Sequence, residues 1–408
     1  MKQASAILVM LVLSFSAISE SAPLPYAVDS TIPQSGGCPQ PNRWNLSLSS
    51  PLNRRWSTAL PTLLSPTILI VAQQNSPAAV AEIQQTISDS FAVWAGVAGT
   101  TFNSNYYPGL LAPIRQVSAA NSCTDDAEDN VDGLNTICFN QSSIGFTSGV
   151  LAFTRTITAN DPGATVGSSA PAAFAGQILD ADTLFRNDGQ ATSATPGAVF
   201  TSQGQGAYDL ESLLIHEIGH WFGLDHSAVI RAMMFPFAPP PGQFLGDRPI
   251  FTVPDAPLAD DDRTGIRAQY ADPNDTLNVG ALRGRILPAN PFALAILPAP
   301  STGASVTGIV GAHVVAVDAD TGSVIAGTLA GWICNPANPP THFDGSFDIQ
   351  RPPGGHNYNL YAEPLVGLAL PADFSDALAD LCSATTAPTC ETPAVNTNCN
   401  VRIQPATQ

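Results

Sequence analysis

Hydrophobic positions recur with helical spacing in two parts of the chain. Between residues 77 and 98 the apolar side chains include the i, i+4 and i+7 spacings of one helix face, at Ala79, Ile83, Ile87, Phe91 and Trp94. The second stretch follows Asp209, a residue type that caps helices, and has apolar residues at Leu213, Leu214, Ile218 and Phe222. Both patterns predict a helix with one buried face, and the aromatic residues of the first helix are expected in a hydrophobic core.

Short apolar runs bounded by turn residues predict strands elsewhere in the chain. Four such runs precede the second predicted helix, at residues 67–72, 132–139, 149–154 and 176–185. Beyond residue 273 the pattern becomes one of short strands separated by Gly and Pro, at residues 282–286, 307–318, 344–349 and 358–363. The change from mixed helix and strand to strands alone predicts two folded domains, of which the second is all-β.

The length and the hydrophobic content agree with this division. The chain has 408 residues, of which 44% are hydrophobic, and this is enough for separate hydrophobic cores. We expect a short N-terminal segment at residues 20–43, a first domain at 44–272, a second domain at 273–366 and a Cys-containing C-terminal tail at 367–408.

Residues 1–19 have the features of a secretory signal peptide. Lys2 precedes the apolar run of residues 6–13, and residues 17–19 offer a cleavage site of small residues. An N-terminal membrane anchor is the alternative, but the apolar run is short for a membrane span. We therefore expect a soluble protein that is secreted and extracellular.

The acidic charge balance excludes two classes of partner. The formal net charge is −18 with 15 Lys and Arg residues, whereas nucleic acids and anionic membrane surfaces require clustered positive charge. Charged residues make up only 12% of the chain, so the acidity reflects a low content of basic residues.

Three of the six histidines lie close together, next to a glutamate. On a helix, His216 and His220 project from the same face, so both imidazoles can reach one metal ion. Glu217 is placed to act on a metal-bound water as a general base. Gly223 permits the left-handed turn that ends a helix, and His226 can then return as the third ligand. Three protein nitrogens leave the fourth position of a tetrahedral zinc open, as in catalytic sites.

This complete HExxHxxGxxH pattern resembles the signature of the metzincin zinc metalloproteases. Met234 follows it, and its spacing from His226 and the Phe235-Pro236 pair after it resemble the Met-turn of the matrixins. The resemblance covers residues 44–272. It implies a zinc metalloendopeptidase with an α+β catalytic domain of the α/β/α type, containing a mixed twisted sheet and a long active-site helix.

The resemblance also implies a substrate-binding edge strand and a closing helix. By position the edge strand is at residues 177–184, beginning with Gln177, Ile178 and Leu179, and the closing helix is at residues 258–270. Backbone pairing with an edge strand holds an extended peptide regardless of its side chains.

The strands of the second domain resemble the carboxypeptidase regulatory-like β-sandwich. A domain of that kind would position the enzyme or bind a surface partner of unknown identity. His313, His342 and His356 are scattered singly within it and are interpreted as structural or surface residues.

Seven cysteines in an exported chain favour disulfide bonds, and the odd number leaves at least one unpaired or paired between molecules. Proximity suggests Cys123 with Cys138, and pairing among Cys334, Cys382, Cys390 and Cys399. Matrixins are held latent by a propeptide cysteine that ligates the zinc, and Cys38 is the candidate latency thiol here. The segment around Cys38 is shorter than a matrixin prodomain and lacks its usual motif, which favours a disulfide to the C-terminal tail.

An acidic loop is the candidate calcium site. Calcium requires several oxygen ligands, and the loop offers Asp125, Asp126, Glu128, Asp129 and Asp132, with Asp180 and Asp182 as further candidates from the sheet. The alternative is a solvated acidic loop. This region contains no histidines, so the second, structural zinc of animal matrixins is not expected.

We therefore predict a secreted zinc endopeptidase that hydrolyses extracellular proteins with Glu217 as the general base. One alternative is three ordinary histidines on a core helix. A second is a surface-binding protein with a vestigial protease domain, which the intact Glu217 and its three histidines disfavour. A third is a zinc hydrolase that acts on a non-peptide polymer.

Overall fold

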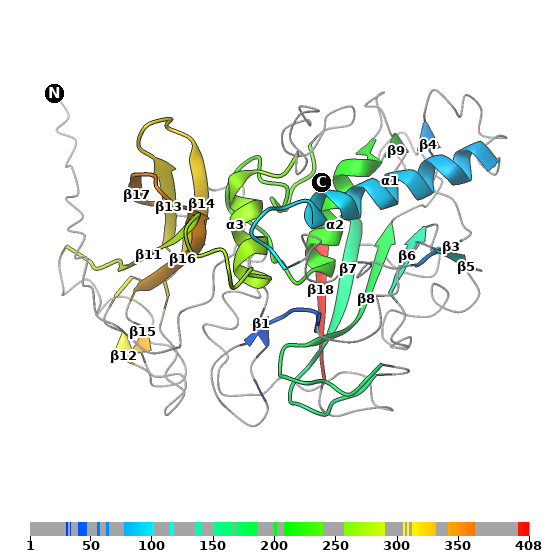
Figure 1. Cartoon of the computed structure of the whole chain (residues 1–408), viewed down its shortest axis with the longest axis horizontal. Helices are drawn as coiled ribbons and strands as arrows, with labels where there is room; N and C mark the ends of the chain where they lie inside the picture. Colours follow the sequence, from blue (N-terminus) through cyan, green and yellow to red (C-terminus); the bar gives the residue numbers. More distant parts are fainter. Residues whose placement is uncertain are drawn as a thin grey trace.

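A six-stranded mixed sheet is the centre of the larger part of the molecule (Figure 1). The computed structural model describes residues 30–31, 33, 40–46, 55–57, 63–64, 77–101, 115–117, 135–139, 150–166, 169–185, 200–201, 208–239, 257–289, 305–306, 308–309, 312–331, 342–343, 345–363 and 399–407. In spatial order the strands of the sheet are β18 (Cys399–Thr407), β7 (Val150–Ala159), β8 (Ile178–Phe185), β6 (Thr136–Phe139), β3 (Arg55–Ser57) and β5 (Arg115–Val117). The pairs β18–β7 and β7–β8 are antiparallel, and the other pairs are parallel.

Two helices pack against each other, and the second of them also packs against this sheet. They are α1 (Pro77–Ala95) and α2 (Leu210–Trp221). The predicted apolar face of α1 is buried at Ile83, Ile87, Phe91 and Trp94. The indole of Trp94 also donates a 2.8 Å hydrogen bond to the carbonyl of Ile215, which fixes α1 against α2. The hydrophobic pattern thus predicted both the helix and its buried side.

The strand predicted as a substrate-binding edge lies inside the sheet. Strand β8 pairs with β7 along its length and with β6 at its C-terminal end. At its start, the carbonyl of Gln177 accepts from Ala159 N–H on one side, and the N–H of Ile178 donates to the carbonyl of Arg43 on the other. The prediction of an exposed edge at Gln177, Ile178 and Leu179 is therefore wrong, because neighbouring segments already occupy both sides of this strand.

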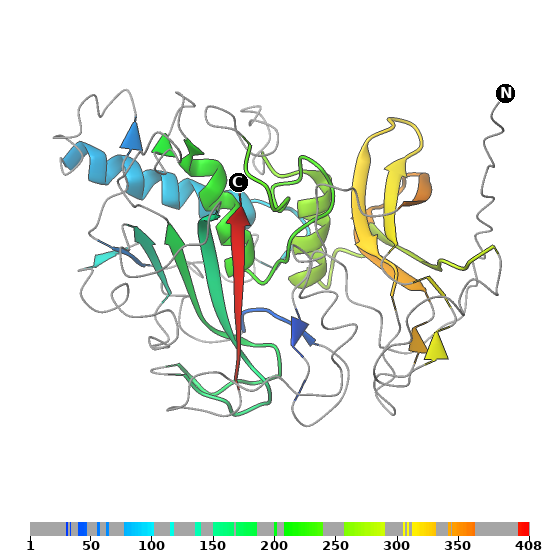
Figure 2. The ribbon, with the colours of Figure 1, turned by 180° about the vertical axis from the view of Figure 1, so that it is seen from behind.

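The C-terminal tail contributes a strand that sequence analysis did not predict. Strand β18 pairs with β7 from Cys399 opposite Ala159 to Thr407 opposite Val150. It covers the side of β7 that faces away from β8, and Figure 2 shows it running beside α2. Residues 399–407 thus belong to the six-stranded sheet rather than to a separate tail.

The predicted closing helix is α3 (Asp260–Gln269), which lies between the sheet part and a C-terminal group of strands (Figures 1 and 2). We call residues 279–363 the C-terminal β region. Its strands are β11 (Val279–Arg285), β12 (Ser305–Val306), β13 (His313–Asp318), β14 (Val324–Leu329), β15 (His342–Phe343), β16 (Ser346–Pro353) and β17 (Tyr358–Glu363). They form the sheets β11–β16, β12–β15 and β14–β13–β17, and α3 packs against β14 and β16.

The pattern of alternating strands and turns is therefore present in the C-terminal β region. Ile286, Val314, Ala330 and Phe347 form a buried apolar cluster there. The predicted strands at 282–286, 344–349 and 358–363 correspond to β11, β16 and β17, whereas β14 was not predicted. Membership of the carboxypeptidase regulatory-like family stays a prediction.

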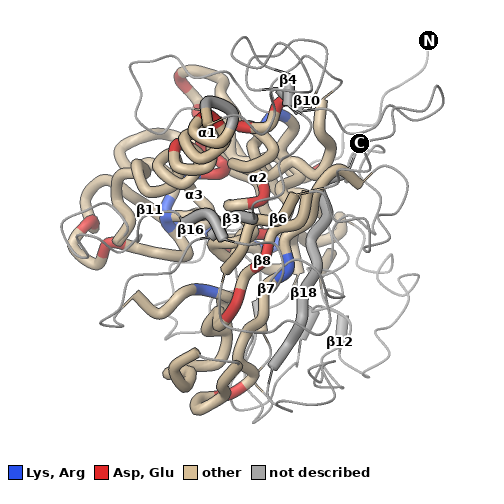
Figure 3. The backbone as a smooth tube through the Cα atoms, turned by 90° about the vertical axis from the view of Figure 1, so that its right-hand side faces the viewer, with Lys and Arg blue, Asp and Glu red and all other residues tan. Residues whose placement is uncertain are grey.

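The remaining described strands are short: β1 (Ser30–Thr31), β2 (Gln40–Pro41), β4 (Leu63–Leu64), β9 (Phe200–Thr201) and β10 (Tyr208–Asp209). The predicted signal peptide, the strand at 67–72, Cys38 and the acidic loop at 125–132 lie outside the described residues. Within the described residues, none of the helices combines the length and apolarity that a membrane span requires. Lys and Arg are scattered along the described backbone (Figure 3).

Candidate metal centre

The helix that carries the first two histidines begins at a side-chain cap. Asp209 has extended backbone angles, and its Oδ1 accepts a 2.9 Å hydrogen bond from the N–H of Ser212. This bond satisfies one of the four N–H groups that a helix start leaves unpaired. The predicted N-cap is present, and it fixes the first turn of α2 ahead of the histidines.

The same helix ends in a left-handed glycine turn. Gly223 has φ +87°, its N–H donates to the carbonyl of His220 at 2.8 Å, and the N–H of Leu224 donates to the carbonyl of Gly219 at 3.0 Å. These two bonds form the Schellman arrangement that closes helices. A Cβ at position 223 would collide with the carbonyl oxygen of Asn42, so glycine is required twice over.

Side chains from two distant segments hold the last carbonyl groups of α2. The indole of Trp44 donates a 2.9 Å hydrogen bond to the carbonyl of Trp221, and the hydroxyl of Tyr270 donates a 2.8 Å bond to that of Phe222. The helix end is therefore anchored where the chain turns back toward His226.

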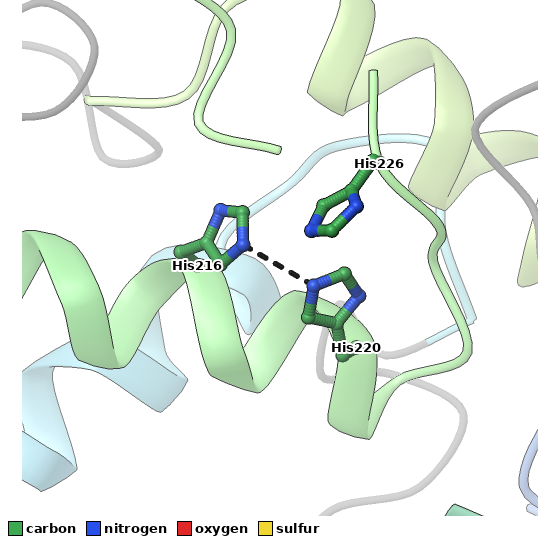
Figure 4. A group of neighbouring side chains, drawn as sticks. All are labelled: His216, His220 and His226. Carbon is green, nitrogen blue, oxygen red and sulfur yellow. Dashed lines mark hydrogen bonds between the residues drawn. The ribbon is translucent and has the colours of Figure 1, made fainter. Parts of the chain in front are cut away.

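The turn brings the third histidine to the first two, and the three rings face a common centre (Figure 4). The ring centroid of His220 lies 4.8 Å from that of His216 and 4.8 Å from that of His226, and the centroids of His216 and His226 are 5.4 Å apart. One nitrogen of each ring lies within 4.8 Å of the others, and all three side chains are buried. When the His, Cys, Asp and Glu side chains of the described residues are compared, these three histidines are the group that lies close enough together to hold a metal ion.

Backbone carbonyls determine which nitrogen of two rings faces the centre. His216 Nδ1 lies 2.7 Å from the carbonyl oxygen of Met233, and His220 Nδ1 lies 2.8 Å from that of Leu224. A carbonyl oxygen only accepts, so each Nδ1 carries the proton and each Nε2 presents a lone pair. Such an outer partner orients a metal-ligating histidine.

Burial keeps these rings neutral. Loss of hydration, together with the nearby His226, lowers the pKa of His216 to about 3. Burial also lowers the pKa of His220 well below its usual value, again with the neighbouring histidines adding to the shift. Both rings are therefore uncharged at neutral pH, with a proton on Nδ1 and a lone pair on Nε2, which is the form that binds metal.

The geometry of the two Nε2 atoms fits a bound zinc ion. They lie 3.2 Å apart, although both present lone pairs that repel each other. Two nitrogens that bind one tetrahedral zinc at 2.0–2.1 Å lie roughly 3.3 Å apart. A cation between them would convert the repulsion into two bonds, and a nitrogen of His226 lies close enough to serve as a third ligand.

Glu217 points to a neighbouring strand rather than joining this cluster. Its side chain is fully buried, and its Oε2 accepts a 2.6 Å hydrogen bond from the hydroxyl of Thr154 on β7. Thr154 also lies 2.9 Å from the hydroxyl of Thr183 on β8. Strand β7 of the sheet therefore fixes the orientation of the carboxylate that α2 carries.

The Met-turn residue lies under α2. Met234 is fully buried, and a Cβ added at Gly219 would collide with its sulfur. Gly219 directly precedes His220, so the thioether fills the space beneath the ligand-bearing turn. The carbonyl of Met234 accepts a 2.7 Å hydrogen bond from the N–H of Ser227, which directly follows His226.

Two buried carboxylates hold this turn, and sequence analysis missed both roles. Asp262 accepts hydrogen bonds from the N–H groups of Met233 at 2.7 Å and Met234 at 3.0 Å. Asp261 accepts a 2.5 Å hydrogen bond from the hydroxyl of Ser227. Burial raises the pKa of Asp261 to about 6 and that of Asp262 to about 7. The resemblance predicted only a closing helix here, because the partners of these two carboxylates lie far away in the sequence.

Two of the candidate calcium ligands lie among the described residues, as does His313 of the scattered histidines. Asp182 accepts a 2.8 Å hydrogen bond from the N–H of Thr136, and Asp180 is buried on the same strand. His313 lies 3.2 Å from a carboxylate oxygen of Glu363. Calcium binding by the acidic loop and a latency role for Cys38 stay predictions.

Further structural predictions concern a histidine and a disulfide. His356 lies 2.7 Å from a carboxylate oxygen of Asp318. Cys138 is buried and disulfide-bonded. Its pairing with Cys123 stays a prediction because Cys123 lies outside the described residues.

Comparison with known proteins agrees with the chemistry of this centre. Residues 65–271 match the family described as Matrixin. Metalloendoproteinase 1 of Glycine max is 42% identical over 74 residues, which are 18% of this chain and 21% of that protein. Metalloendoproteinase 4-MMP of Arabidopsis thaliana is 40% identical over 73 residues, which are 18% of each chain. The matched stretches thus span about a fifth of these relatives.

Proposed function

Because the chain belongs to the matrixin family of metallopeptidases, we propose that it is a zinc-dependent endopeptidase in which Glu217 is the general base. The observation that carries the proposal is the convergence of three buried histidines on one centre, with two Nε2 atoms 3.2 Å apart. Zinc fits this donor set, since neutral imidazoles are common zinc ligands.

We assign the ligand positions to His216, His220 and His226. When bound there, zinc would polarise the scissile carbonyl and lower the pKa of the attacking water. The carbonyl groups of Met233 and Leu224 fix the rings of His216 and His220, so the ligands need little rearrangement.

Glu217 supplies the proton transfers. It is adjacent to His216 in the chain but does not belong to the histidine cluster. This suits a general base, which acts on the water and does not bind the metal. Its carboxylate accepts the proton of the attacking water and then delivers it to the leaving amine. Thr154 holds one carboxylate oxygen at 2.6 Å, and this contact restricts the orientation of the base during both transfers.

The proposed substrates are extracellular proteins. This proposal combines the family with the signal-peptide pattern of residues 1–19, which predicts export. The metalloendoproteinase names of the two plant relatives support the same class of reaction.

The experiment is to incubate the purified, zinc-loaded protein with a mixed peptide library and to run Glu217→Gln beside it. The wild type should cleave internal peptide bonds, and Glu217→Gln should lose at least about a hundredfold in kcat, since general acid–base catalysis contributes 10²–10⁴-fold. Both proteins should retain one zinc per chain. Equal cleavage by the two proteins would refute the role of Glu217, and no cleavage by a zinc-loaded wild type would refute the peptidase assignment.

A further inference from the structure

A buried carboxylate connects the loop of the third histidine to the C-terminal β region. Asp261 is 3% exposed and lies in the first turn of α3. Its Oδ2 accepts a 2.5 Å hydrogen bond from the hydroxyl of Ser227, and its Oδ1 accepts a 2.7 Å hydrogen bond from the backbone N–H of Gly327 on β14. One side chain thus joins two segments that are far apart in the sequence.

Ser227 transmits this contact to the metal centre. It directly follows His226, its N–H donates to the carbonyl of Met234 at 2.7 Å, and its hydroxyl oxygen accepts from the N–H of Val229 at 3.0 Å. The hydroxyl has a single proton, and that proton is given to Asp261. The position of the His226 loop therefore depends on where Asp261 is held.

Strand β14 has a suitable donor because it is an edge strand. It is the outer member of the sheet β14–β13–β17, so its outward N–H groups have no partner strand within that sheet. The N–H of Gly327 points instead to Asp261, and a charged acceptor makes a stronger hydrogen bond than a neutral one. The bond satisfies a buried donor and fixes α3 against the C-terminal β region.

The close approach of β14 requires glycine at this position. A Cβ at residue 327 would lie 2.5 Å from Nε2 of His313 and 3.0 Å from Cγ2 of Val229. Val229 belongs to the loop between His226 and the Met-turn, so the β region contacts this loop directly as well as through Asp261. A larger residue would push β14 away from both.

We propose that Asp261 is a positioning residue through which β14 holds the His226 loop, so that the C-terminal β region is part of the zinc-binding apparatus. The proposal rests on the proposed zinc site. It predicts that zinc affinity depends on residues that do not touch the metal, since outer contacts of metal ligands contribute about 10–100-fold to affinity.

The first test measures zinc affinity by competition with a chromophoric chelator, using the full chain. Ser227→Ala and Asp261→Ala should each weaken zinc binding by about tenfold or more. If the two act through one bond, the double variant should be little weaker than Asp261→Ala alone. Asp261→Asn keeps an acceptor for Gly327 and should restore most of the affinity.

Asp260→Ala is the matched control. Asp260 is the adjacent acidic residue of α3, is more exposed, and forms an ion pair with Arg263 at 3.3 Å. Its removal should leave zinc affinity unchanged within about twofold, because exposed ion pairs contribute little. Circular dichroism and thermal melting of every variant separate a change in zinc affinity from a failure to fold.

The second test acts from the β region. Gly327→Ala should weaken zinc binding, and adding His313→Ala, which removes the closest obstacle, should recover part of the loss. Wild-type zinc affinity in folded Ser227→Ala and Asp261→Ala would overturn the inference. Because affinity is measured without substrate, the inference is separable from the peptidase assignment, which fails if the zinc-loaded wild type cleaves no peptide.

Discussion

The hydroxyl of Thr154 donates a 2.6 Å hydrogen bond to Oε2 of Glu217. Thr154 lies on β7 and Glu217 on α2, so this bond joins the sheet to the proposed general base. The same hydroxyl also lies 3.0 Å from the carbonyl oxygen of Glu217, so the strand approaches both the side chain and the backbone of this residue. The base is therefore oriented by the sheet and not only by its own helix.

Thr154→Val should lower kcat by about tenfold and leave the zinc content unchanged. The substitution preserves the shape of the side chain and removes a hydrogen bond to a charged group, which contributes about 1.5–3 kcal/mol. Steady-state kinetics on a cleaved peptide, with metal analysis of the same samples, measures both quantities. Thr183→Val is the control, since it removes only the outer partner of Thr154 and should have a smaller effect. An unchanged kcat in Thr154→Val would show that the helix alone orients Glu217.

Gly219→Ala should destabilise the protein by about 1–3 kcal/mol, the usual range for overpacking a core. The added methyl would collide with the sulfur of Met234 and would lie 2.9 Å from Cζ2 of Trp94. Denaturant titration measures the loss. Gly280→Ala is the control, because a Cβ there meets nothing within 4 Å. Equal stability of the two variants would mean that the Met-turn moves aside without cost.

The features that could be predicted from the sequence are those whose physics is local. His216 and His220 are one helical turn apart, Asp209 caps the turn before them, and Gly223 ends the helix through its own backbone freedom. Each follows from spacing and residue type within a dozen or so positions. The hydrophobic face of α1 was predictable for the same reason.

The features that could not be predicted depend on which segments meet in space. The local sequence pattern of β8 would be the same in an edge strand and in an inner strand. Its pairing with β7 and its hydrogen bond to Arg43 make it an inner strand. Strand β18 joins the sheet from the other end of the chain. The roles of Asp261 and Asp262 likewise depend on partners at Ser227, Gly327 and the Met-turn, and a helix start rich in aspartate does not indicate them.

Asp262 should make the stability of the metal-free protein depend on pH. Its folded-state pKa is raised from 3.8 to about 7, since burial outweighs the hydrogen bonds from Met233, Met234 and Ala259. Because the folded state holds the proton more tightly than the unfolded chain, this contribution to stability is complete below about pH 4 and is lost as the pH rises toward 7.

Asp262→Asn cannot ionise and should lack this dependence. The free energy of unfolding of the wild type, relative to the variant, should therefore fall between pH 4 and 7 and be flat above that range. Each pKa unit corresponds to about 1.4 kcal/mol, so a fall of a few kcal/mol is expected. Urea titrations of both metal-free proteins across this range measure it. A constant difference between them would show that the hydrogen bonds to Asp262 outweigh its burial.

His226→Ala should abolish stable zinc binding and with it peptide cleavage. It removes one of three ligands, and two histidines on one helix leave the metal half exposed to competing water and chelators. Metal analysis after gel filtration should find less than about one tenth of a zinc per chain, and a chelator should remove zinc from the wild type with activity restored on its return. His356→Ala, which removes a half-exposed histidine bonded to Asp318 in the C-terminal β region, should keep both zinc and activity. Retention of zinc by His226→Ala would mean that the metal is held elsewhere, and the site built on α2 would have to be abandoned.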